Sequence, residues 1–170
     1  MRSLKTVVAR KIFIRFAQSR DITRLLAEGV ITGPNPPRET WSQRIVKWLS
    51  EQQAGRRAIF IAEDASGLLG MVQLVFAFPL GYSDPEAANG SDIAMMDGLR
   101  LSAAAPPEVG TQLVEEVQKL AQKRQVHTLT FLLPMNQNKA LRQAKSWGFE
   151  EFRIMAEPNK MLAFFRKSID

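Results

Sequence analysis

The chain has 170 residues, of which 45% are hydrophobic and none is cysteine. This length suits one sizeable hydrophobic core and is short for two, so we expect a single domain over residues 1–170. The lack of cysteine excludes thiol nucleophiles, disulfides and thiolate metal sites. No apolar run approaches membrane-spanning length, and basic residues interrupt Val7 to Phe16. We therefore expect neither a membrane anchor nor a signal-peptide core, and a cytoplasmic location.

The net charge of +6 is unevenly distributed along the chain. Residues 1–62 carry 12 Lys or Arg against 4 acids, residues 63–98 carry none against 6, and residues 99–170 carry 11 against 7. Clustered basic residues bind nucleic acids by neutralising phosphates. Here they are scattered and no nucleic-acid motif accompanies them, so nucleic acid is the disfavoured partner. The alternative is a solvated basic surface that also attracts an anionic cofactor.

The first half of the chain predicts a strand, two helices and an antiparallel pair of strands. Ser19 is expected to cap the first helix. Trp41 and Trp48 recur at helical spacing in the second helix, where a core role is favoured over a binding site. A turn that ends at Gly67 separates the paired strands. The predicted elements are Lys11–Ala17, Arg20–Glu28, Arg38–Gln53, Ala58–Glu63 and Gly70–Phe76.

Residues 79–92 are too polar and too rich in turn residues for a core element, so they predict a long surface loop. The second half then predicts a right-handed strand-helix-strand unit, another helix and a terminal hairpin. Gly110 lies in the first turn of the unit's helix, where backbone amides are able to bind phosphate. These elements are Ile93–Ser102, Glu108–Lys123, His127–Leu133, Asn136–Trp147, Glu151–Met155 and Lys160–Phe165.

This order of elements resembles the GNAT superfamily of acyl-CoA-dependent N-acetyltransferases over most of the chain. The residues that carry the resemblance are Leu99-Arg100-Leu101 at the strand end, Gly110 in the helix, and Asn138-Lys139-Ala140 ahead of Gly148-Phe149. The resemblance implies an α+β, three-layer fold, with a mixed, mostly antiparallel sheet of about seven strands and four helices. It also implies that the fourth and fifth strands splay apart around the pantetheine arm of the coenzyme.

The resemblance implies acetyl-CoA, or another acyl-CoA, as co-substrate and no metal. The end of the fourth strand would pair with pantetheine through backbone groups, as an added strand does. The start of the following helix would bind the pyrophosphate through its amides and the Thr111 hydroxyl. Pro106, Pro107 and Glu108 depart from the family's glycine-rich pattern, and ordinary helix initiation is the alternative there. The coenzyme-binding candidates are Leu99, Arg100, Leu101, Val109, Gly110, Thr111 and Asn138.

Asp97 falls near the position at which the family often carries a glutamate as general base. A carboxylate in an otherwise apolar strand needs a use or a partner, so Asp97 is the candidate catalytic base. A salt-bridged or solvent-facing Asp97 is the alternative. The family's general-acid tyrosine corresponds to Ala144 here. The departing thiolate would then leave unassisted or take its proton from water.

Tyr82, Asp84 and Asp92 lie on the connection that borders the acceptor side in the family, together with other acids of this segment. An acidic lining would favour a cationic amine, carried by a small molecule or a peptide. A solvated acidic loop is the alternative.

Three functions remain open from the sequence. The first is an N-acetyltransferase that transfers an acetyl group from acetyl-CoA to a primary amine. The second is a GNAT-fold module that has lost catalysis and binds acyl-CoA as a sensor or serves as an interaction domain. The third, least favoured, is a basic binding protein for nucleic acid or an acidic partner. A homodimer is also kept open.

Overall fold

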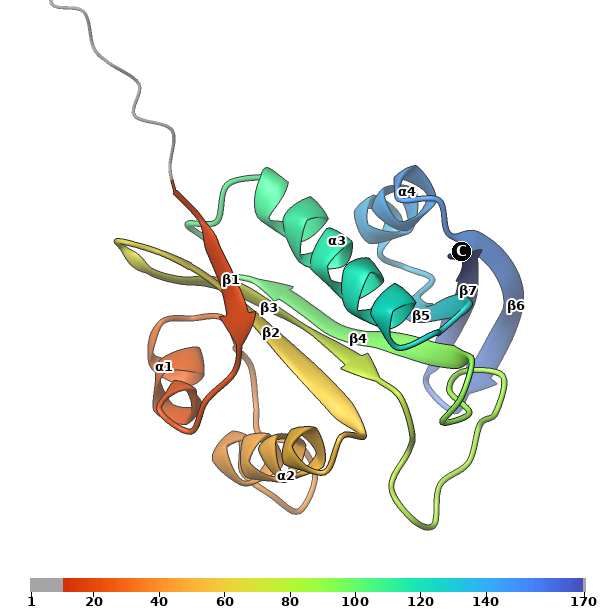
Figure 1. Cartoon of the computed structure of the whole chain (residues 1–170), viewed down its shortest axis with the longest axis horizontal. Helices are drawn as coiled ribbons and strands as arrows, with labels where there is room; N and C mark the ends of the chain where they lie inside the picture. The colour runs from red at the N-terminus through yellow and green to blue at the C-terminus, as the bar shows by residue number, and fades with distance from the viewer. Residues whose placement is uncertain (1–10, 170) are drawn as a thin grey trace, which may run out of the picture.

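A computed structural model describes residues 11–169, which form three layers with one sheet between two pairs of helices (Figure 1). Helices α1 (Asp21–Ala27) and α2 (Trp41–Gln53) cover one face of the sheet, and α3 (Glu108–Lys123) and α4 (Asn138–Ser146) cover the other. Residues 7–10 of the stretch considered as a signal-peptide core lie outside the described residues.

The sheet has seven strands in the order β1-β2-β3-β4-β5-β7-β6. Every neighbouring pair is antiparallel except β4 and β5, which are parallel. This arrangement confirms the predicted three-layer fold with a mixed, mostly antiparallel sheet and four helices. The strands are β1 (Phe13–Phe16), β2 (Arg57–Asp64), β3 (Gly67–Val75), β4 (Ile93–Leu101), β5 (Thr128–Pro134), β6 (Glu150–Glu157) and β7 (Lys160–Ser168).

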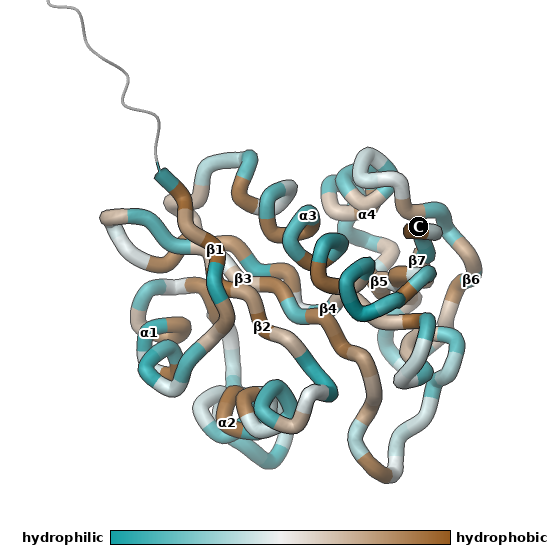
Figure 2. The backbone as a smooth tube through the Cα atoms, viewed as in Figure 1, coloured by the Kyte–Doolittle hydropathy of each residue, from teal (hydrophilic) through white to brown (hydrophobic). Residues whose placement is uncertain are grey.

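The central strands are apolar on both faces because helices cover both faces. In β2, Phe60 belongs to the core beneath α3, whereas Ile59 and Ile61 belong to the core beneath α1 and α2. Figure 2 shows these central strands as mostly hydrophobic and α3 as alternating between hydrophobic and hydrophilic residues. A strand buried on both faces loses the alternation of a half-exposed strand. Among residues 11–169, no helix has the length and apolar character needed to cross a membrane.

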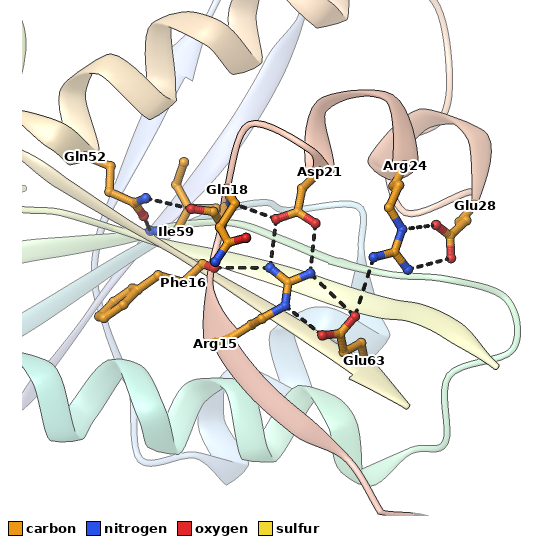
Figure 3. Close-up of polar contacts among 10 residues, drawn as sticks. Arg15, Phe16, Gln18, Asp21, Arg24, Glu28, Gln52, Ile59 and Glu63 are labelled. Carbon is orange, nitrogen blue, oxygen red and sulfur yellow. Dashed lines mark hydrogen bonds and ion pairs between the residues drawn. The ribbon is translucent and has the colours of Figure 1, made fainter. Parts of the chain in front are cut away.

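A network of charged side chains fixes α1 against the sheet (Figure 3). The guanidinium of Arg15 on β1 donates to both carboxylate oxygens of Asp21 at 2.8 Å and to Glu63 of β2 at 2.7 Å. Asp21 also accepts a bond from the Gln18 amide at 2.7 Å. The predicted Ser19 cap is therefore wrong: the N-cap residue is Arg20, without a side-chain cap bond. At this turn the Asp21 carboxylate, rather than a serine hydroxyl, accepts the hydrogen bond of a backbone amide, that of Gln18.

Helix α2 begins three residues later than the sequence pattern predicts. Thr40 accepts a bond from the Gln43 amide at 3.1 Å, and the Gln43 side chain accepts one from the Thr40 amide at 2.8 Å. This reciprocal capping box satisfies two amides and sets the helix start at Trp41.

Candidate active site

The candidate site lies where β4 and β5 separate. These parallel strands pair only over their first four residues, Ile93–Met96 with Thr128–Phe131. Beyond this point, β4 contains a bulge: its register with β3 shifts, and Gly98 has a φ of +58°. That conformation is costly for residues other than glycine. The opening implied by the family resemblance is therefore present, with the bulge at its start.

The open edge of β4 presents backbone groups to this gap. The Ser102 amide donates to the Leu69 carbonyl at 2.8 Å, on the β3 side. Backbone groups alternate in direction along a strand, so the amides and carbonyls of Leu99 and Leu101 face away from β3. Among the described residues, β4 pairs with β5 no further than Met96. These groups suit an extended, amide-bearing ligand such as pantetheine, which pairs as a short added strand.

The start of α3 lies directly beyond this edge. Its N-cap residue is Pro107, no side chain caps it, and the Val109 amide donates to the Pro106 carbonyl at 3.1 Å. The hydroxyl of Ser102, between β4 and α3, is buried without a hydrogen-bond partner among the described residues. A helix start without a side-chain cap suits a pyrophosphate, although Glu108 adds a negative charge to the first turn.

Helix α4 packs closely against this helix start. The Trp147 indole donates to the Thr111 hydroxyl oxygen at 3.2 Å, which leaves the hydroxyl proton able to donate to a ligand. A Cβ added at Gly110 would lie 3.6 Å from both Gln143 and Trp147. Asn138 is exposed at the start of α4 and, with Gln143, borders a surface depression of about 400 Å³. The coenzyme candidates of the two helices thus lie on adjoining surfaces.

On the face of the sheet beneath α2, polar side chains form a chain that ends at Asp97. The Arg57 guanidinium donates to Glu51 at 2.6 Å and to Gln73 Oε1 at 2.7 Å. Asp97 Oδ2 lies 4.0 Å from Arg57 Nη1, and 49% of its side chain is exposed. Ala94 and Met96 belong to the opposite core, beneath α3. Asp97 is thus loosely ion-paired and open to solvent.

Arg100, predicted to act through its backbone, also places its side chain beneath α2. Its guanidinium lies 5.0 Å from the centre of the Trp41 ring, and that of Arg44 lies 5.8 Å from the same ring. Burial lowers the pKa of Arg100. The negative charge of Asp97 partly offsets this effect, whereas the positive charge of Arg44 lowers the pKa further. Trp41 belongs partly to the core, as predicted, and also forms a wall of the candidate site.

The acidic loop lies away from Asp97. Asp84 and Glu86 form ion pairs with Arg153 of β6 at 3.5 and 3.0 Å. Asp92 accepts from the Asn89 side chain at 2.7 Å and precedes β4, so five residues, about 16 Å, separate it from Asp97. Tyr82 is exposed, with its ring edge against Phe78. The proposed acceptor residues of this loop are therefore not gathered around the candidate base.

Sequence reasoning missed Arg57 and Gln73. A glutamine within the apolar run Met71–Val75 was a signal, because a buried amide requires partners. At the position of the family's tyrosine, Ala144 is fully buried in the core. The side chain at position 144 therefore cannot act as a general acid in the gap between β4 and β5. Among the described residues, no three His, Asp or Glu side chains form a group able to hold a metal ion.

No family model and no curated protein matches the chain. Several solved structures share its architecture. An N-acetyltransferase from Staphylococcus aureus Mu50 has a TM-score of 0.73 at 17% identity, over 94% of this chain and 99% of that one. A structure from Salmonella typhimurium, containing its cofactor acetyl-CoA, has a TM-score of 0.70 at 14% identity, over 94% of both chains. A spermidine/spermine N-acetyltransferase from Vibrio cholerae has a TM-score of 0.68 at 14% identity, over 93% of this chain and 92% of that one.

These likenesses define the class of fold. The chain has the fold of the GNAT N-acetyltransferases, over nearly its whole length and nearly the whole length of these neighbours. The site described above lies at the strand separation that the resemblance indicated.

Proposed function

We propose that this protein is an N-acetyltransferase that transfers an acetyl group from acetyl-CoA to the primary amine of a small molecule or peptide. The observation that carries the proposal is the separation of β4 from β5, with an unpaired backbone edge on one side and a half-exposed carboxylate, Asp97, beside it. The fold neighbours support it, since they include named N-acetyltransferases and a structure with acetyl-CoA.

The residues of this site have distinct roles in the proposed reaction. When bound, acetyl-CoA supplies a thioester, whose carbonyl carbon the amine attacks as the carbon–sulfur bond breaks. The ammonium group of the acceptor must lose a proton before its nitrogen can attack, and Asp97 accepts this proton, directly or through water. Backbone amides at the open edge of β4 donate to the carbonyl oxygen. With Ala144 in place of an acid, water supplies the proton to the thiolate, which is a weaker base than an amine.

The proposal retains three expectations from the sequence. The chain acts as one domain, which the single sheet from β1 to β7 supports. It acts in the cytoplasm. It needs no metal for the transfer.

Two measurements on the purified full chain test the proposal. Calorimetry with acetyl-CoA is expected to show one binding site per chain. Thiol release with a panel of primary amines is expected to exceed the rate without an amine. Binding without release for any amine would favour the alternative, a catalytically inactive acyl-CoA-binding module, for which the buried Ala144 is the supporting observation. Absence of acetyl-CoA binding would overturn both.

A further inference from the structure

Arg100 is a half-buried cation that forms no ion pair with the described residues, although Asp97 is near enough for its charge to act on the pKa of Arg100. Among residues 11–169, no carboxylate lies within ion-pair distance of it, and its Nε is buried without a hydrogen-bond partner. Its guanidinium rests over Trp41, a contact that leaves the in-plane N–H groups available. A charge taken partly out of water is costly unless an anion accompanies it. Arg100 is therefore suited to bind an anion that the chain does not supply.

Gln73 provides a second unused donor on the same face. The side chain is fully buried, and Oε1 accepts from Arg57, which is only a donor, so the amide nitrogen must point the other way. Nε2 has no hydrogen-bond partner among the described residues and lies 2.9 Å from the position of a Cβ at Gly98. The free amide N–H groups thus lie against the bulge, next to Asp97.

Register brings these donors together with the candidate base. Gln73 is the direct partner of Asp97 in the β3–β4 ladder, and Arg100 lies three residues further along β4, past the bulge. Arg57 and Arg100 contact Trp48 and Trp41, both on α2, so they share one face of the sheet. This face therefore combines cations and free N–H donors with the half-exposed carboxylate of Asp97.

Acids that would attract a purely cationic acceptor are occupied elsewhere. Asp84 and Glu86 pair with Arg153, and Glu51 pairs with Arg57. Glu39 of the loop before α2 pairs with both Arg44 and Lys47. These acids are thus already paired, which weakens the expectation of a cationic acceptor that the acidic loop suggested.

We propose that the acceptor is an amino acid: a small molecule whose amine is presented to Asp97 while its carboxylate binds the guanidinium of Arg100 and the amide of Gln73. This inference rests on the proposed function and specifies its substrate class. Arginine binds carboxylates through paired N–H groups, and such charge-assisted bonds are the strong ones. Asp97 repels the carboxylate and attracts the ammonium group, which fixes the orientation of the molecule.

The test compares amines that differ only in the carboxylate. Thiol release is measured with lysine and cadaverine, ornithine and putrescine, and phenylalanine and phenethylamine. The carboxylated member of each pair is expected to have a kcat/KM about tenfold or more higher, because its partner lacks the charge-assisted hydrogen bonds of the carboxylate. A further pair, β-alanine and 2-aminoethylphosphonate, distinguishes a carboxylate from another anion. The wild-type comparison needs no variant to fold.

Variants then assign the preference to its residues. Arg100→Gln is expected to reduce the ratio of kcat/KM within each pair to near one, mainly through KM for the carboxylated member. Lys119→Gln is the control, because Lys119 is an exposed cation of α3 on the opposite face of the sheet, and the ratio of kcat/KM in this variant is expected to stay as in wild type. Thermal melting checks that both variants fold.

The outcomes separate the two proposals. If no amine in any pair supports thiol release, the proposed function fails. If amines are acetylated but the decarboxylated members react equally well or better, the proposed function stands and the amino-acid inference is overturned. An unchanged preference in folded Arg100→Gln would also overturn the role of that residue.

Discussion

At the scale of single residues, the site depends on which charged groups are already paired. Arg57 donates short hydrogen bonds to Glu51 and Gln73, whereas its Nη1 lies 4.0 Å from Asp97 Oδ2. Asp97 is thus the weakly held member of this chain of polar groups. A half-exposed pair of this kind contributes little to stability, because water screens it. Removing the carboxylate should therefore affect chemistry far more than folding.

We expect Asp97→Asn to lower kcat/KM for the best amine by about 10²–10⁴-fold, the usual range for a general base. Addition of alkali should recover part of the loss, since a deprotonated amine needs no base. The measurement is thiol release against pH, with the melting temperature as a check on folding. Glu116→Gln removes an exposed acid on α3 and is the control. If acetylation by Asp97→Asn equals that of wild type, the assigned base is wrong.

At the scale of elements, the bulge in β4 is one part of the site that the sequence alone did not predict. The apolar run Ile93–Ser102 predicted the strand, and its neighbours predicted the strand-helix-strand order. The residue that faces Asp97 depends on register between segments about 24 residues apart, and the bulge shifts that register. Local patterns do not contain this information. The pairing of Asp84 with Arg153, a residue of another hairpin, was hidden for the same reason.

Two glycines of the site should respond to alanine with opposite signs. Gly98→Ala meets both a positive φ and a Cβ position 2.9 Å from Gln73, so we expect the free energy of unfolding to fall by about 1–3 kcal/mol. Gly110 lies in helix α3 with ordinary contact distances around a new Cβ. Gly110→Ala should therefore be neutral or stabilising by about 0.5–1 kcal/mol. Urea unfolding measures both, and a stable Gly98→Ala would show that the bulge does not need glycine.

At the scale of the whole molecule, the helical layer of α1 is joined to the sheet by buried charge as well as by apolar packing. Burial would raise the pKa of Asp21, but hydrogen bonds from Arg15 and the Gln18 amide hold it below its ordinary value of 3.8. Hydrogen bonds from Arg15 likewise hold the pKa of Glu63 below its usual range. These carboxylates stabilise the fold above their unfolded pKa values, and the stabilisation is lost as pH falls through the folded ones.

We expect Asp21→Asn to lower the free energy of unfolding at pH 7 by about 3 kcal/mol, because it leaves Arg15 without its bidentate partner. The difference from wild type should shrink as pH falls below about 4, where the carboxylate of the unfolded chain takes up a proton, and should be lost below the lowered pKa of the folded carboxylate. Denaturant unfolding at several pH values measures this. Glu157→Gln, which removes an exposed ion pair with Lys160, should change little. A pH-independent difference would contradict the electrostatic origin.

The short β4–β5 ladder makes β4 an unusual strand, since it is central in the sheet over its first half and an edge over its second. A free edge invites strand addition by other chains, including copies of itself. The bulge at Gly98 twists this edge, and α3 begins directly after it. A long foreign strand finds only a few backbone groups to pair with, whereas a short, extended ligand needs no more. The same geometry that suits a short, extended ligand is thus expected to protect the middle of the sheet from aggregation.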